Sequence, residues 1–419
     1  MPTDSVAPLP GSALTGLLGP IIPGFFVVDG LALVLLGTLA LIAILLILAS
    51  PATYGFFSNV VLLVFFLTGA FGTITAANVV ALIVAWEVCA LAAWGIARRD
   101  AGADRVAASV VPLQAAGALG SFLVITGLAL LAIARHDLGL GPSGERVPTV
   151  VPLALLVGLA LKTYGVLAEI QTVHPWGHIS LAGPTLAGAG VLVLGASPLL
   201  RLLGLTLADT TGWREIAFWS GTAFALVTVL AALVESDYRR ILTNSAFSQF
   251  WLVVALLSSG PQASLAGAAI SAIVAALAFS GLFLAISTVE GASTAVLGDR
   301  IGGLAQRLPF TAALFLVCTL ALPGLPPFGG FTAADLGDAA GEMNAHAVTW
   351  IAVNALTFLS MIRLFDRLFL GELRLPVRAE RRLPAVLASG AVVSALALLG
   401  SLASFLSLLL ASGARTTAG

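Results

Sequence analysis

Lys162 is the side chain in this sequence with the clearest capacity for chemistry. It is the only lysine among the 19 lysines and arginines of the chain, and it lies inside the apolar run VPLALLVGLALKTYGVLA. An ionisable group is costly in hydrocarbon, so its presence there indicates a functional site. Glu169 follows two helical turns later and would share a helix face with Lys162. We expect Glu169 either to belong to an ion path or to balance the charge of the lysine.

Glu87 is a second ionisable residue within an apolar run, ALIVAWEVCALAAW, and would lie about halfway along its helix. Further on, His174 and His178 have a spacing that could hold a metal ion. Pro175 and Gly177 lie between them, however, and interrupt a regular helix. We therefore expect no metal site at these histidines.

Composition indicates a membrane protein. The chain has 59% hydrophobic and only 9% charged residues, with a mean hydropathy of +1.08, which is incompatible with a water-soluble globule. The net charge of -1 argues against a nucleic-acid partner. Cys89 and Cys318 both lie in apolar runs, where buried thiols are expected rather than a disulfide or a metal site.

The apolar runs predict an all-α polytopic membrane protein, because about 20 apolar residues are needed for each helix that crosses the bilayer. Twelve spans are expected, at about residues 28–48, 56–75, 77–97, 107–134, 149–171, 182–204, 215–235, 240–258, 263–288, 308–326, 345–370 and 383–411. A short N-terminal segment (1–26) would precede a transmembrane domain (27–382), and a last helix and tail (383–419) would follow it.

The arginines gather on one side of these spans, which the positive-inside rule assigns to the cytoplasm. Both chain termini would then lie outside the cytoplasm. The cytoplasmic set is Arg98, Arg99, Arg105, Arg239, Arg240, Arg300, Arg307, Arg374, Arg378, Arg381 and Arg382. The opposite side has only Arg135, Arg146, Arg201, Arg214 and Arg415.

Two spans are interrupted at comparable places in the two halves of the chain, by HPWGHISLAGPT (174–185) and by PGLPPFGGF (323–331). Proline removes a backbone donor and glycine loosens a helix, so each stretch should link two half-helices. Paired broken helices are typical of transporters built from repeats, with the ion path beside the breaks. The alternative is two ordinary proline-rich loops. The expected break residues are Pro175, Gly177, Pro184, Pro323, Pro326 and Pro327.

The run ESDYRRILTNSAFSQ (235–249) resembles the motif D-L-K-R-x-L-A-Y-S-S-x-S-Q of the antiporter-like subunits of respiratory complex I, Mrp antiporters and membrane-bound hydrogenases. The matched residues are Asp237, Arg240, Leu242, Ser245, Ser248 and Gln249. Other landmarks of that family follow in the same order over residues 27–372, namely Trp86-Glu87, His174 with Trp176, Pro184-Thr185, Gly302-Gly303, GLPPFGGF and Arg363.

This resemblance implies antiporter-like inverted repeats and a proton path in which a glutamate on one helix pairs with a lysine on the first broken helix. Those roles would fall to Glu87 and Lys162. Burial disfavours a charged amine and a nearby carboxylate favours it, so the pair could switch the lysine between holding and releasing a proton. His174 would relay protons at the first break, with a hydrogen-bonded helix end as the alternative.

The sequence also departs from the family pattern. The central lysine of the family corresponds to Phe279, and a histidine after the first break corresponds to a position near Leu192. Near the second break, the usual lysine or glutamate corresponds to Ala334, although Asp335 is adjacent. A dry apolar gap is a high barrier for an ion.

The resulting hypothesis is a proton-translocating subunit of a complex I-like or hydrogenase-type redox complex in a bacterial or archaeal cell membrane. Its partners would be other membrane subunits, the lipid bilayer and protons, with Na⁺ as the alternative ion. No site for NADH, flavin, quinone, haem or an iron-sulfur cluster is recognisable, so we expect no cofactor and no redox catalysis by this chain. The alternatives are a structural subunit that bridges neighbours, a proton-driven subunit for uptake of dissolved inorganic carbon, and a stand-alone Na⁺/H⁺ exchanger.

Overall fold

Membrane-spanning helices make up most of the computed structural model, which describes residues 19–22, 24–49, 56–100, 103–141, 147–172, 182–206, 213–258, 263–292, 302–325, 328, 345–373, 390, 391 and 395. Nine helices within these ranges are long and apolar enough to cross a membrane, and two shorter apolar helices accompany them. The expected all-α polytopic class is therefore confirmed. The twelfth expected span, at 383–411, lies almost wholly outside the described residues.

The helices begin and end within a few residues of the predicted spans. Their bounds are α2 (Gly30–Ala49), α3 (Phe56–Thr75), α4 (Val79–Asp100), α5 (Ala103–Arg135), α6 (Val150–Thr172), α7 (Ala182–Pro184), η2 (Thr185–Ala196), α8 (Ser197–Leu199), η3 (Leu200–Thr206), α9 (Trp213–Val234), α10 (Tyr238–Ser258), α11 (Ala263–Ala292), η4 (Leu304–Gln306), α12 (Pro309–Ala321) and α14 (Ala345–Phe369).

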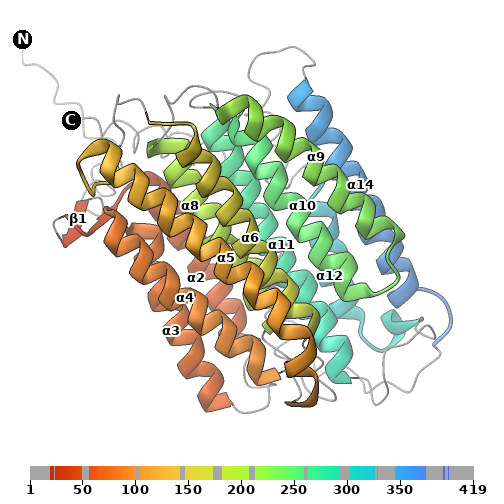
Figure 1. Ribbon diagram of the computed structural model, residues 1–419. Helices are drawn as coiled ribbons and strands as arrows, with labels where there is room; N and C mark the ends of the chain where they lie inside the picture. The colour runs from red at the N-terminus through yellow and green to blue at the C-terminus, as the bar shows by residue number, and fades with distance from the viewer. Residues whose placement is uncertain are drawn as a thin grey trace, which may run out of the picture.

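The bundle has a central group of helices and a peripheral one. The apolar windows of the α7–η3 segment and of α11 are entirely buried, and that of α10 is 89% buried. By contrast, the windows of α5 and α9 are only 28% and 33% buried. Helices α2 to α5 lie on one side of the centre, and α9 and α14 lie on the other (Figure 1). Peripheral helices are therefore the ones that face lipid or partner subunits.

The segment after Pro184 is a π-helix rather than an α-helix, which the sequence did not predict. It runs through η2 and resumes in η3 after the short α8. The backbone N–H of Ser197 donates to the carbonyl of Leu192, five residues back. The local sequence, TLAGAGVLVLGA, has three glycines, and glycine holds an α-helix weakly. Long π-helices are rare, and shorter π-bulges are frequent at functional sites.

A small antiparallel hairpin, β1 (Gly19–Ile22) and β2 (Phe26–Val28), precedes α2. The carbonyl of Phe25 accepts a hydrogen bond from the N–H of Ala77, which links the hairpin to the α3–α4 connection. The N–H of Val79 donates in turn to the carbonyl of Leu138, after α5. These bonds tie together the helix connections at one end of the bundle.

Candidate functional site

Lys162 and Glu87 lie next to each other in the structure. Lys162 is on α6 and Glu87 is near the middle of α4, and Lys162 Nζ is 3.6 Å from Glu87 Oε1. The lysine side chain is 10% exposed and the glutamate side chain is 33% exposed. Within the described residues, Glu87 Oε1 accepts no hydrogen bond. The pair is therefore an ion pair with a loose geometry and one partly open partner.

Two further groups hold the ammonium of Lys162. Its Nζ donates a hydrogen bond of 2.6 Å to Ser121 Oγ on α5. Nζ also lies over the indole of Trp86, 4.9 Å from the ring centroid, where the negative face of the ring attracts a cation. Three helices thus contribute to one charged site.

Gly120 lets α5 come close enough for Ser121 to reach the lysine. A Cβ at Gly120 would lie 2.6 Å from the backbone nitrogen of Lys162 and 2.7 Å from the carbonyl oxygen of Gly158. No side chain fits between the two backbones at this point. The glycine therefore sets the distance between α5 and α6 at the level of the ion pair.

A cavity of about 390 Å³ opens beside the pair between α4, α5 and α6. Glu169 lines it together with Glu87, Ser121 and Lys162, and apolar side chains such as the exposed Leu91 form its rim. The structure thus brings together three of the residues singled out from the sequence. The carboxylates of Glu87 and Glu169 both lie within electrostatic range of the single ammonium.

Trp86 also connects the ion pair to the π-helix. Its indole Nε1 donates a hydrogen bond of 3.0 Å to the carbonyl of Leu194 in η2. The indole is 1% exposed. One residue therefore touches the lysine with its ring face and the broken-helix segment with its ring edge.

The remaining predicted site residues are not all described. Pro184 ends α7 and is buried, and its carbonyl accepts a hydrogen bond of 3.2 Å from Ser280 Oγ on α11. Pro323 follows the end of α12, where Gly324 adopts a φ of +76° and turns the chain. Those outside the described residues are His174, Pro175, Gly177, Pro326, Pro327, Ala334 and Asp335.

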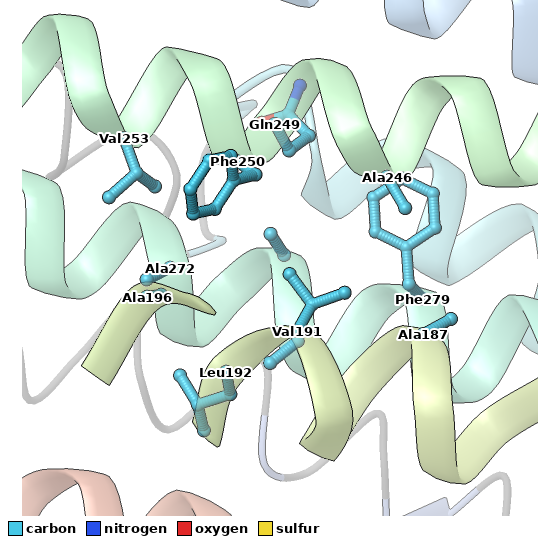
Figure 2. A pocket seen from close by; sticks show the side chains of 12 residues that line it. Ala187, Val191, Leu192, Ala196, Ala246, Gln249, Phe250, Val253, Ala272 and Phe279 are labelled. Carbon is cyan, nitrogen blue, oxygen red and sulfur yellow. The ribbon is translucent and has the colours of Figure 1, made fainter. Parts of the chain in front are cut away.

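Phe279 and Leu192 line one apolar cavity in the centre of the bundle (Figure 2). It has a volume of about 10 Å³ and lies between η2, α10 and α11. Gln249 is the only polar side chain among those that line it. Phe279 and Leu192, which stand where the family has a lysine and a histidine, therefore line the same apolar cavity.

Two buried ion pairs were missed by sequence reasoning. Arg201, which we had assigned to a loop, lies in η3 and donates to both carboxylate oxygens of Asp29, at 3.0 and 3.2 Å. Arg239, expected among the arginines on the cytoplasmic side, is buried and pairs with Glu290 at 2.6 Å. Asp29 also caps α2, since the N–H of Ala32 donates to its Oδ1 at 2.7 Å. The sequence feature that could have indicated these two ion pairs is the position of their charged residues near the ends of apolar runs.

A network of neutral polar side chains joins α10 to α14. Gln249 Nε2 donates to Asn354 Oδ1 at 3.1 Å and to Thr357 Oγ1 at 3.3 Å, and the hydroxyls of Ser245 and Ser360 are 3.4 Å apart. All five residues are buried. Sequence reasoning had treated Ser245 and Gln249 only as parts of a motif. In the described part of the chain, no group of three His, Cys, Asp or Glu side chains could hold a metal ion.

Comparison with known proteins identifies relatives over most of the chain. Residues 76–360 match the family model described as NADH:quinone oxidoreductase/Mrp antiporter, TM. The NADH-quinone oxidoreductase subunit N of Deinococcus radiodurans is 28% identical over 324 residues, which cover 73% of this chain and 65% of that protein. One subunit of the Na⁺/H⁺ antiporter of Alkalihalophilus pseudofirmus is 25% identical over 392 residues, 83% of this chain and 48% of that protein.

The fold is similar to that of a solved assembly. A chain of the Mrp complex from a Dietzia species superposes with a TM-score of 0.80 at 18% identity, over 96% of this chain and 86% of that chain. At this identity the likeness concerns the fold alone. The chain spans 65% of the length of the Deinococcus protein and 48% of that of the Alkalihalophilus protein.

Proposed function

Because the chain belongs to the NADH:quinone oxidoreductase/Mrp antiporter transmembrane family, we propose that it is a proton-translocating subunit of a multisubunit membrane complex. The complex would be of the complex I, Mrp or hydrogenase type, and the redox or ion-exchange chemistry of the partners would drive it. Glu87 and Lys162 would form the site that takes up and releases the proton. The chain would contribute no cofactor of its own.

The observation that carries the proposal is the Glu87–Lys162 pair beside an open cavity. A purely structural pair would be expected to be dry and closely bonded. Here the distance is 3.6 Å, one partner is a third exposed, and the cavity has room for several water molecules. The cavity is therefore large enough to hold the water through which a proton would be exchanged.

The chemistry rests on the balance of two effects at Lys162. A charged amine is costly in a low dielectric, whereas the Glu87 carboxylate, the Ser121 hydroxyl and the Trp86 ring all favour it. Movement of α4 that carries Glu87 away removes the largest favourable contribution. The ammonium then gives up a proton and becomes a neutral amine, and return of Glu87 favours proton uptake again.

A test is proton flux in proteoliposomes that contain the purified complex. We expect Lys162→Ala and Glu87→Gln each to lower coupled flux by at least about tenfold, since each removes one half of the switch. Assembly is checked by the subunit content of the purified complex. Unchanged flux in both variants, in an intact complex, would contradict the proposal.

The variant Lys162→Arg tests whether the site needs a residue that can lose its proton or only a positive charge. Arginine keeps a positive charge beside Glu87 but remains protonated under all conditions in a protein. We expect this variant to assemble normally and to lose coupled flux as Lys162→Ala does. Normal flux with arginine would mean that the site needs only a fixed cation.

A structural role without conduction is the second candidate, and one observation favours it. Phe279 and Leu192 close the central apolar cavity, and no ionisable group lines that cavity. A subunit of this kind would support neighbouring subunits without carrying ions. Its signature is normal flux in Lys162→Ala combined with loss of the complex when the chain is deleted.

A further inference from the structure

Two cavities of opposite character lie on either side of η2. The cavity beside the ion pair has a volume of about 390 Å³ and is lined by two carboxylates, an amine and a hydroxyl. The cavity between η2, α10 and α11 has a volume of about 10 Å³ and apolar walls (Figure 2). Beyond it lies the neutral network of Gln249 and Asn354 on α10 and α14.

A closely packed layer separates the two cavities. Val166 lines the larger cavity and packs against Gly190 of η2, where an added Cβ would lie 3.3 Å from Val166 Cγ1. Thr163 packs against Gly195 so closely that an added Cβ would be 2.3 Å from its Oγ1. Trp86 adds its indole, bonded to η2 at Leu194. All three side chains are at least 95% buried.

The small cavity offers a proton few partners, because eleven of its twelve lining residues are apolar. A buried water needs two to four polar contacts, and a space of about 10 Å³ is at the lower limit for one water. Gln249, its only polar lining residue, donates its amide hydrogens to Asn354 and Thr357 on the α14 side. Figure 2 shows the amide nitrogen of Gln249 directed away from Leu192. Among the described residues, no chain of hydrogen bonds therefore joins Lys162 to Gln249.

We infer that the layer of Trp86, Val166 and η2, with the apolar cavity behind it, insulates the ion pair from the interior. Protons reach and leave Lys162 only through the cavity between α4, α5 and α6. This inference rests on the proposed function and makes it specific. A proton that leaves the ammonium passes through water in that cavity to the Glu169 carboxylate, and the products are a neutral amine and a carboxylic acid. Onward transfer then goes to an acceptor group of the partner subunit that covers the open face of the cavity, and not through α10 and α11.

Reactivity of introduced thiols tests the insulation without measuring transport. The native Cys89 and Cys318 are fully buried and are replaced by alanine. Ala90→Cys places a thiol in the larger cavity, Ala276→Cys places one in the small cavity, and Val227→Cys on α9 faces outward as the lipid control. The complex is treated in its membrane with 2-aminoethyl methanethiosulfonate. Ala118→Cys is a second position in the larger cavity.

We expect Ala90→Cys to react at least about tenfold faster than Ala276→Cys and Val227→Cys, because the thiolate forms only where water and the reagent reach it. Reaction of Ala276→Cys at a rate similar to that of Ala90→Cys would overturn the insulation. If neither Ala90→Cys nor Ala118→Cys reacts faster than the lipid control Val227→Cys, the larger cavity is not the proton route and the inference is wrong.

Measurement of proton flux tests whether the proton route passes through α10. The double variant Gln249→Met/Asn354→Leu replaces both partners of a buried hydrogen bond, which is nearly neutral for stability when shape is kept. We expect its flux to stay within about twofold of the wild type, since a route that avoids α10 does not depend on this bond. Loss of flux in it, with wild-type thiol rates, would overturn the inference and leave the proposed function intact. Normal flux in Lys162→Ala would reject the proposed function, and the thiol rates would still decide the insulation.

Discussion

The ion pairs in the described part of the chain are of three kinds. Arg201–Asp29 and Arg239–Glu290 are short, at 3.0 and 2.6 Å, and all four side chains are at most 8% exposed. Lys162–Glu87 is longer, at 3.6 Å, and its glutamate faces a cavity. Arg240–Glu235, at 3.8 Å, has a side chain 58% exposed at the arginine and 25% exposed at the glutamate. Among the ion pairs of the described residues, the Lys162 pair is the one that lies within the membrane-spanning helices and lines a large cavity.

The choice of cation matches this difference. Arginine stays charged and binds a carboxylate with two parallel N–H groups, as Arg201 does with Asp29. A third bond, from Arg201 to the carbonyl of Ile74, fixes η3 against α3. Lysine is a single point charge that can lose its proton. Arginine thus occurs where the helices must be held, and lysine occurs where we propose that a proton moves.

Removing one partner of an arginine pair should have the largest effect on stability. Arg201→Met leaves Asp29 buried and unpaired, which costs about 3–5 kcal/mol of unfolding free energy in comparable cases. Unfolding of the purified chain in mixed detergent and dodecyl sulfate, followed by circular dichroism, measures it. The matched double variant Asp29→Leu/Arg201→Met removes both charges and should recover most of the loss. If Arg201→Met lowers the unfolding free energy by less than about 1 kcal/mol, the arginine pairs do not differ in stability from the Lys162–Glu87 pair.

Much of the fold could be predicted from the sequence because bilayer thickness fixes the length of each apolar run. The bounds of α3, α10 and α14 match the expected spans to within about two residues, a margin that is usual for helix ends. The π-helical form of η2 could not be predicted in this way. A run of glycine, alanine and leucine has no polar face, so its periodicity does not distinguish an α-helix from a π-helix.

The candidate site could be predicted only in part. A lone lysine in an apolar run is visible in the sequence, and so is a glutamate halfway along another. Their pairing came from family resemblance, and the structure brings them to 3.6 Å. The Asp29–Arg201 contact joins residues 172 positions apart, and no local pattern connects them. The roles of Ser121 and Trp86 depend on how α5 and α6 pack, which composition does not determine.

Lys162→Met should affect stability much less than Arg201→Met does, although it should abolish proton flux. Glu87 is left without its cation, but it is 33% exposed beside a cavity and can be solvated or take up a proton. We expect a change in unfolding free energy of at most about 1 kcal/mol, because functional sites are often not optimised for stability. The same detergent titration measures this change. A loss as large as that of Arg201→Met would identify Lys162–Glu87 as a third structural pair.

Glu235→Gln should have the smallest effect and completes the comparison. The N–H groups of Ser236 and Asp237 donate to Glu235 Oε1 and lower the pKa of this carboxyl, with Arg240 adding a weaker attraction. A lowered pKa stabilises the fold above the unfolded carboxyl value of about 4.3, and the gain is lost as pH falls through the folded value. Since the arginine of the pair is exposed and the pair is long, the difference from the wild type at pH 7 should be below about 1 kcal/mol. Unfolding at pH 7 and below about pH 4 measures it, and a difference that persists in acid would assign the effect to packing rather than charge.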